Sequence, residues 1–263
     1  MAFTIALAGK GGTGKTTLSA LLVRAIGEAH LGSILAVDAD PNATLHEALG
    51  VEVERSIGEI TEEMLSAVES LPGGMTKHEW LEYNIQLFVV EADGFDLIQM
   101  GRPEGAGCYC YANSIVRSCM DALQDSYDFV VMDNEAGLEH LSRRTTREAD
   151  VLLLVSDPSL RGTRTAARLS ALADELSIGV GRRYIVYNRA EEPLDDAIVT
   201  AAAQAGLEIA GVIPPDQGIS ECDLAGLGLF DLAADSQALS AVRGMLDLVA
   251  LPGGSLHREA QAG

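Results

Sequence analysis

The segment that most constrains the fold runs from Gly9 to Thr16 and matches the pattern G-x-x-x-x-G-K-[ST] in full. An apolar run, Phe3–Ala8, precedes it, and apolar residues at helical spacing follow from Lys15 onward. A strand, a glycine-rich loop and a helix in this order bind phosphate, because loop N–H groups and the positive helix end surround phosphate oxygens. The segment therefore predicts one strand–loop–helix unit of a parallel α/β fold.

The polar residues of this loop have distinct predicted roles. Lys15 is expected to reach the β- and γ-phosphates of a nucleotide, and the Thr16 hydroxyl is expected to ligate Mg²⁺. A glycine-rich turn that binds no nucleotide is the alternative, and the strand and helix around the loop argue against it. The residues predicted here to bind nucleotide are Gly11, Gly12, Thr13, Gly14, Lys15, Thr16 and Thr17.

The rest of the chain alternates apolar runs with helical patterns. Strands are predicted at Phe3–Ala8, Ile34–Val37, Phe95–Met100, Tyr127–Met132, Val151–Val155, Arg183–Tyr187 and Glu208–Ile213. Helices are predicted from Lys15, near 113–125, 138–148, 161–177 and 194–204, from Ser236 onward, and over 56–91 with a break at 72–74. Continuous apolar strands that alternate with helices indicate an α/β fold with a doubly wound, mainly parallel sheet. We expect one domain over residues 1–263.

The charge of the chain narrows the choice of partners. It carries 18 basic and 39 acidic residues, a formal net charge of −21. Such a surface repels phosphate backbones and anionic lipid, so neither nucleic acid nor a membrane is an expected partner. Four cysteines among 263 residues do not form a disulfide scaffold, and no signal peptide or membrane-length apolar run is visible. We therefore expect a cytoplasmic protein.

Lys10 is a second lysine in the loop, and like-charge repulsion prevents it from sharing the position of Lys15. The sequence K-G-G-T-G-K-T resembles the deviant Walker A motif of the group that contains MinD, ParA and the nitrogenase iron protein. In that group the early lysine reaches across a dimer interface to the nucleotide of the partner. The resemblance implies an ATPase that forms a homodimer around ATP, with Lys10 and Lys15 as catalytic residues. A solvent-facing lysine of no consequence is the alternative.

Three aspartates that end predicted strands fit the same family. The resemblance implies that Asp40 orients or deprotonates the attacking water, and that Asp38 lies near Mg²⁺. Asp133 fits a Walker B aspartate that holds Mg²⁺ through water, and Gly137 would sense the γ-phosphate. Phosphoryl transfer requires mainly positioning and charge neutralisation, which carboxylates at these places supply. A helix-capping role is the alternative for Asp38 or Asp40.

Two later segments resemble the base-binding parts of the family. Asn188 follows a predicted strand, and its amide offers a donor and an acceptor that match the adenine edge. The segment Pro214, Pro215 and Asp216 follows the next strand and would complete the base pocket. Residues 188–191 do not match the N-K-x-D pattern of guanine-selective proteins. The expected nucleotides are therefore ATP and ADP.

A cysteine pair lies in the predicted loop near 101–112. Cys108 and Cys110 can both turn toward one metal ion, and a thiolate pair suits zinc, copper(I) or nickel. Two sulfurs fill half of a four-coordinate shell, and a dimer axis near the loop would supply the other half. Two inert thiols are the alternative.

The resemblance narrows at two segments, Gly107–Cys110 and Asp133–Leu141, which look like the CooC/AcsF accessory ATPases. This likeness implies ATP-dependent delivery of nickel to carbon monoxide dehydrogenase or acetyl-CoA synthase, with nickel or zinc bound between protomers. Two other functions stay open. A ParA/MinD-type positioning ATPase would need a basic surface or an amphipathic tail, and an electron donor like the nitrogenase iron protein would need more widely spaced cysteines.

Overall fold

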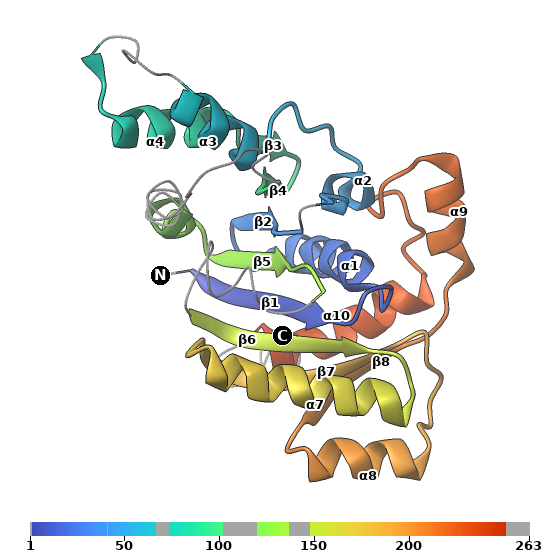
Figure 1. Cartoon of the computed structure of the whole chain (residues 1–263). Coiled ribbons are helices and arrows are strands. Elements are labelled where there is room, and N and C mark those ends of the chain that lie inside the picture. The colour runs from blue at the N-terminus through green and yellow to red at the C-terminus, as the bar shows by residue number, and fades with distance from the viewer. Residues whose placement is uncertain (1, 41, 67–73, 102–119, 137–147, 251–263) are drawn as a thin grey trace, which may run out of the picture.

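The computed structural model describes residues 2–40, 42–66, 74–101, 120–136 and 148–250 (Figure 1). Its strands are β1 (Phe3–Gly9), β2 (Ile34–Asp38), β3 (Val90–Ala92), β4 (Phe95–Gln99), β5 (Phe129–Asp133), β6 (Glu148–Ser156), β7 (Gly179–Asn188) and β8 (Glu208–Ile213). Its helices are α1 (Lys15–Glu28), α2 (Leu45–Leu49), α3 (Ile57–Ser66), α4 (Lys77–Leu87), α7 (Leu160–Glu175), α8 (Asp196–Gln204), α9 (Gln217–Ala225) and α10 (Gln237–Val249).

The described strands form one eight-stranded sheet in the order β3-β4-β2-β5-β1-β6-β7-β8. All neighbouring strands run parallel except β3, which pairs antiparallel with β4. Helices cover both faces: α1 and α10 pack on one, and α7 and α8 on the other (Figure 1). The predicted doubly wound, mainly parallel α/β fold is confirmed.

Alternation along each strand assigns its side chains to two hydrophobic clusters. Ile5 and Leu7 of β1 belong to the cluster that contains α1 and α10, whereas Ala6 and Ala8 belong to the one that contains α3, α4 and α7. Side chains of successive strand residues point to opposite faces, so a strand buried on both sides must be apolar throughout. This explains the unbroken apolar runs in the sequence.

The polar residues predicted from strand ends meet at the carboxyl edge of the sheet. Asp38 of β2 is the register partner of Asp133 in β5, and Leu7 of β1 is also a partner of Asp133. Gly9 pairs with Val155 one strand further along. Parallel strands therefore bring the glycine loop and both aspartates to one place.

Several predicted elements were wrong in extent. Residues 56–91 contain α3 and α4 but also the strand β3, which forms a hairpin with β4 through Gly94 (φ 89°). The predicted helix near 138–148 cannot reach its end, because Glu148 already belongs to β6. Most of that helix and residues 113–119 of another fall outside the described residues.

Two short helices near the carboxyl edge were not predicted. α2 has only five residues and begins where Leu45 donates its N–H to an Asp38 oxygen, a contact seven residues back along the chain. α9 begins with Asp216 as its N-cap and ends at Gly226, whose left-handed conformation (φ 66°) terminates it. Short helices have few periodic positions, so hydrophobic spacing does not reveal them.

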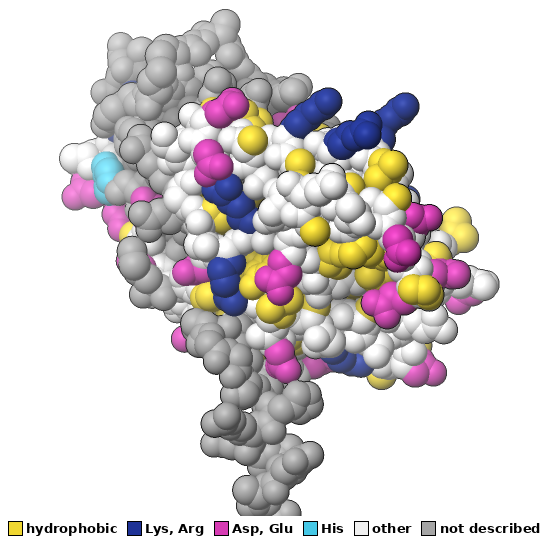
Figure 2. Space-filling model, turned by 90° about the horizontal axis from the view of Figure 1, so that it is seen from below, with side chains coloured by type: hydrophobic (Ala, Val, Ile, Leu, Met, Phe, Trp, Pro, Cys, Tyr) yellow, Lys and Arg dark blue, Asp and Glu magenta, His cyan; other side chains and the backbone are white. Residues whose placement is uncertain are grey.

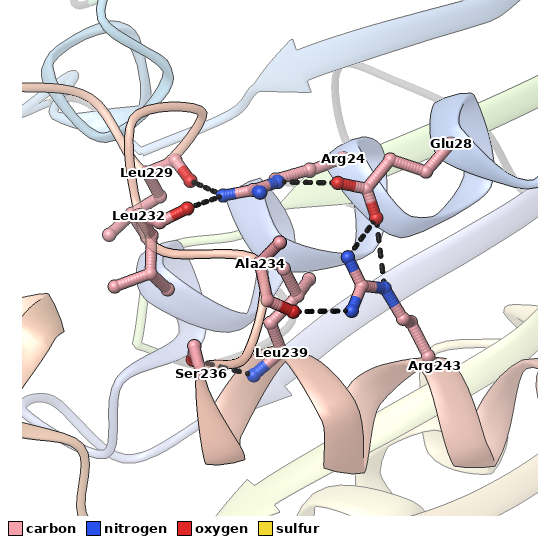
Figure 3. A network of polar contacts seen from close by, with 8 residues as sticks. All are labelled: Arg24, Glu28, Leu229, Leu232, Ala234, Ser236, Leu239 and Arg243. Carbon is pink, nitrogen blue, oxygen red and sulfur yellow. Dashed lines mark hydrogen bonds and ion pairs between the residues drawn. The ribbon is translucent and has the colours of Figure 1, made fainter.

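A polar network ties α1 to α10 and to the segment between α9 and α10 (Figure 3). Arg24 is buried, and its Nη1 donates to the carbonyl oxygens of Leu229 and Leu232, both at 2.7 Å. Its Nε donates to Glu28 at 2.8 Å, and Glu28 also accepts from Arg243 at 2.9 Å. The carboxylate of Glu28 thus joins two arginines from different helices.

Arg24→Met is expected to lower the free energy of unfolding by about 2–3 kcal/mol, because two buried carbonyl groups lose their donor. Urea unfolding measures this loss. The matched control is Arg243→Met: its side chain is 36% exposed, against 8% for Arg24, so a loss below about 1 kcal/mol is expected. If both variants lost the same free energy of unfolding, the contacts of Arg24 with the buried carbonyl groups would not be a main source of stability.

Candidate nucleotide and magnesium site

The loop between β1 and α1 has a shape that other parts of the chain hold in place. Gly12 and Gly14 adopt φ values of 79° and 87°, which glycine tolerates best. The Thr13 N–H and hydroxyl both donate to the Lys10 carbonyl, at 3.3 and 2.8 Å. Asn188 donates from Nδ2 to the Thr13 carbonyl at 2.8 Å, and a β-carbon on Gly14 would lie 2.2 Å from that nitrogen. The loop therefore lies against β7 as well as α1.

A cavity of about 390 Å³ opens above this loop. Its lining residues are Gly11, Gly12, Gly14, Lys15, Thr16, Asp40, Asn42, Glu135, Ala136 and Arg189. Lys15 is buried with 7% of its surface exposed, whereas Lys10 is exposed and is not among the described lining residues. The two lysines of the motif thus occupy different environments. Thr13 and Thr17 also lie outside the lining, and the Thr13 side chain is buried.

Asp38 is fully buried at the end of β2. Its Oδ1 accepts from the Asp40 N–H at 3.1 Å and its Oδ2 from the Leu45 N–H at 2.9 Å. Burial raises the pKa of Asp38 to about 7, and the nearby carboxylates of Asp133 and Asp40 add to this shift against the two N–H groups. Asp38 therefore anchors the segment that leads into α2. A role near Mg²⁺ stays a prediction for this residue.

Asp133 is also buried, and its Oδ1 has no hydrogen-bond partner among the described residues. Burial raises the pKa of Asp133 to about 6, although the Thr16 hydroxyl and the Lys15 charge both lower it. A buried carboxylate oxygen without a partner is costly, and a cation removes that cost. A carboxylate and a hydroxyl are also the oxygen ligands that Mg²⁺ takes beside nucleotide phosphates. Thr16 and Asp133 therefore fit a magnesium ion.

Asp40 lies at the rim of the cavity and is half-buried. Its Oδ1 accepts from the backbone N–H and the side-chain amide of Asn42, at 2.8 and 3.0 Å. This turn holds the carboxylate beside the cavity, where the predicted contact with the attacking water would be made. Asp40, just after β2, and Asp133, at the end of β5, therefore lie where the predicted roles toward water and metal would require them.

The predicted base-binding residues have structural partners of their own. Asn188 holds the loop through Thr13 and accepts the Arg189 N–H at its Oδ1, at 3.0 Å. Asp216 accepts from the Gly218 N–H at 2.9 Å and from the Ser236 hydroxyl at 2.7 Å, so it joins the starts of α9 and α10. Pro214 and Pro215 directly follow β8 and precede Asp216 in the chain. Contact with adenine stays a prediction for all four predicted residues.

Sequence reasoning missed four residues that line the cavity: Asn42, Glu135, Ala136 and Arg189. Arg189 has a left-handed backbone (φ 54°), and its Nη1 lies 3.5 Å from the Gly12 carbonyl oxygen. A guanidinium beside the loop adds positive charge where phosphate would lie. The only feature of the sequence that pointed to Arg189 was its position directly after Asn188.

The remaining predicted site residues lie outside the described residues: Gly137, Cys108 and Cys110. Among the residues that are described, no cluster of three or more His, Cys, Asp or Glu side chains has metal-binding geometry. Within the same ranges, no helix combines the length and apolar composition that crossing a membrane requires.

The sheet order, the glycine loop and the buried Asp133 define a P-loop nucleotide-binding protein of the α/β class. Residues 4–230 match the family described as the CobQ/CobB/MinD/ParA nucleotide binding domain. The chain belongs to this family, whose MinD/ParA-type members generally hydrolyse ATP.

Three relatives show how the chain compares with known proteins. An uncharacterised ATP-binding protein of Methanocaldococcus jannaschii is 44% identical over 240 residues, which cover 90% of this chain and 94% of that protein. The carbon monoxide dehydrogenase accessory protein CooC of Rhodospirillum rubrum is 32% identical over 240 residues, 87% of this chain and 90% of that protein. The structure of the septum site-determining protein MinD from Pyrococcus horikoshii with Mg-ADP superposes with a TM-score of 0.69 at 20% identity, covering 94% and 96% of the two chains. This last likeness shows the fold alone.

Proposed function

We propose that this protein hydrolyses ATP between two copies of itself and delivers a metal ion, nickel or zinc, to a client nickel enzyme such as carbon monoxide dehydrogenase or acetyl-CoA synthase. The observation that carries the proposal is the 32% identity to CooC over 90% of that protein, in a chain that has Lys15, Thr16 and Asp133 at the expected positions of a nucleotide site. The metal ion is the cargo, and ATP controls when it is held.

The nucleotide site supplies the parts that hydrolysis needs. Lys15 and the loop N–H groups would hold phosphate, and Thr16 and Asp133 would hold a magnesium ion, which would neutralise phosphate charge. Asp40, which lines the cavity, would position the attacking water. Lys10 faces solvent and completes the site of the other copy. Each copy therefore needs its partner for full activity.

The cysteine segment begins beside the nucleotide site. The Met100 N–H donates to the Asp38 carbonyl at 2.8 Å, and the Met100 carbonyl accepts from Gly58 at 2.8 Å. Gly101 is the last described residue before the segment of the sequence that contains Cys108 and Cys110. A change at Asp38 on nucleotide binding would act directly on the start of this segment. In the proposed cycle, the ATP dimer brings four thiolates together and hydrolysis separates them.

Metal content per protomer tests the proposal. After equilibration with Zn²⁺ or Ni²⁺ and a non-hydrolysable ATP analogue, about one metal ion per two protomers is expected. Replacing Cys108 and Cys110 together with serine is expected to remove it, because no other thiolate pair is near in sequence. Cys222→Ala is the matched control: Cys222 is a buried free thiol, so its loss should leave the stoichiometry unchanged. Metal content that survives the double substitution would contradict the chaperone role and leave the ATPase assignment standing.

A positioning ATPase of the ParA type is the second candidate, and exposed arginines favour it. Arg161, Arg164 and Arg168 lie three and four residues apart on α7, so they share one side of the helix. Figure 2 shows several basic side chains near one corner of the face seen from below, others on its left side and near its lower edge, and acidic side chains over much of the rest. DNA binding by the ATP form, without a thiolate-held metal, would favour this candidate over the chaperone.

A further inference from the structure

Two leucines stand out of the surface where α9 ends. Leu224 is 87% exposed and Leu227 is 49% exposed. Between them Gly226 caps the helix, with its N–H donating to the Asp223 carbonyl at 3.1 Å, and the Leu227 N–H donates to the Cys222 carbonyl at 2.9 Å. This hydrogen-bonded helix end fixes the backbone of both residues. We call Leu224–Leu227 the leucine ridge.

The chain on both sides of the leucine ridge is acidic. Between Gln217 and Gln237 every charged residue is an aspartate or glutamate, and no lysine or arginine occurs. These acidic side chains are all exposed: Glu221, Asp223, Asp231 and Asp235. Apolar side chains flanked by residues of one charge favour a partner of the opposite charge, and the attraction also speeds the encounter. The ridge therefore fits a segment with apolar side chains between lysines or arginines.

The chain directly after the ridge is held tightly from two sides. Gly228 touches Gly50 at the end of α2, where a β-carbon on Gly228 would lie 2.6 Å from the Gly50 Cα. The Leu229 N–H donates to the Ala48 carbonyl of α2 at 2.7 Å, and the Leu229 carbonyl accepts from the buried Arg24 (Figure 3). Binding of a partner would cost little backbone conformational entropy at the ridge, because the fold already holds the adjacent backbone in one conformation.

The same contacts lead back to the nucleotide site. α2 starts at Leu45, whose N–H is bound by Asp38, and it ends against Gly228. Arg24 belongs to α1, the helix that begins with Lys15 of the loop. Of the two helices that hold the segment after the ridge, α1 therefore starts at a residue of the site, and α2 starts at a residue whose N–H Asp38 binds. A shift of α2 when nucleotide binds would move this segment.

We propose that the leucine ridge is a docking surface for a basic, apolar segment of a partner protein, and that α2 links its affinity to the bound nucleotide. The docking is inferred from the exposure of the two leucines and from the negative charge of the neighbouring residues. The nucleotide dependence rests on the proposed function, since it needs α2 to respond to ATP.

A random dodecapeptide library displayed on phage tests the docking without nucleotide. Enriched peptides are expected to carry apolar residues flanked by lysine or arginine. One enriched peptide, labelled with fluorescein, is expected to bind the Leu224→Ser/Leu227→Ser variant about tenfold more weakly or worse, as lost leucine burial implies. The control Leu176→Ser removes a leucine that is 38% exposed at the end of α7, and it should leave the affinity unchanged.

Three results would overturn the docking: no enrichment, enrichment of acidic peptides, or equal binding to wild type and the double variant. Loss of the ATP dimer in the double variant would instead make the ridge a contact between two copies, and would also reject it. For the link to nucleotide, peptide affinity with a non-hydrolysable ATP analogue is expected to differ about fivefold from that with ADP. Equal affinities would reject the link through α2, while ATP turnover, measured without peptide, tests the proposed function separately.

Discussion

Lys10→Ala is expected to lower ATP turnover by about 10³-fold, the size of effect seen when a cation supplied by a partner is lost from a phosphoryl-transfer site. Lys10 is exposed and does not line the described cavity of its own chain, whereas Lys15 is buried in it. If the Lys10 charge acts only in the nucleotide site of the other copy, it stabilises the transition state in that site and does not hold the nucleotide of its own protomer. Binding of ATP to a single protomer should therefore change only a few-fold.

Turnover and equilibrium binding of a fluorescent ATP analogue measure the two effects separately. Lys15→Ala is the control, because loss of the buried lysine should remove nucleotide binding and the ATP-linked dimer together. Mixing the Lys10→Ala and Lys15→Ala variants is informative as well, since each mixed dimer contains one intact Lys10 and one intact Lys15. Turnover of Lys10→Ala close to that of wild type would show that the lysine only faces solvent. Persistence of an ATP dimer in Lys15→Ala would contradict nucleotide-linked dimerisation.

The free energy of unfolding of the metal-free, nucleotide-free protein is expected to fall by about 6 kcal/mol between about pH 4 and pH 7. Burial raises the pKa of Asp38 to about 7 and that of Asp133 to about 6. In this range the folded state holds protons on these two groups that the unfolded state, with pKa values near 4, has already lost. Stability is therefore greatest near pH 4 and decreases as the pH rises through the folded pKa values.

Carboxylates with lowered pKa values, such as Asp128 and Asp174, have the opposite effect but act at more acidic pH. Urea unfolding at several pH values checks the expectation, and Asp133→Asn should flatten the dependence because it removes one of the two groups. Mg²⁺ with ATP should restore stability near pH 7, since a bound cation favours ionised carboxylates. Stability that rises between about pH 5 and pH 7 would contradict the burial of two protonated aspartates.

Local patterns in the sequence were enough to predict the sheet and the phosphate loop. The unbroken apolar residues of β1, β5 and β6 follow from burial on both faces, and each apolar run is visible without any other part of the chain. The loop Gly9–Thr16 carries its own backbone requirements in its glycines. Asp38, Asp40 and Asp133 were placed at one edge because parallel strands end together.

What Asp38 and Asn188 do inside the protein could not be predicted from the sequence. Asp38 binds the N–H of Leu45 and thereby starts α2, and Asn188 holds the carbonyl of Thr13, a residue 175 positions away. Arg24 likewise reaches Leu229, 205 positions along the chain. Such contacts depend on which strands become neighbours, and no local spacing encodes that.

The sequence by itself therefore determined the elements that depend on near neighbours: the apolar strands, the glycine loop and the type of chemistry that Lys15 and Thr16 can perform. Only the tertiary structure decided which polar groups are desolvated together, because burial comes from the packing of distant elements. That packing leaves Asp133 with an unpartnered oxygen among the described residues, while Leu224 stays exposed. Periodicity assigns a residue to a face of its own element, but what covers that face is set by the rest of the fold.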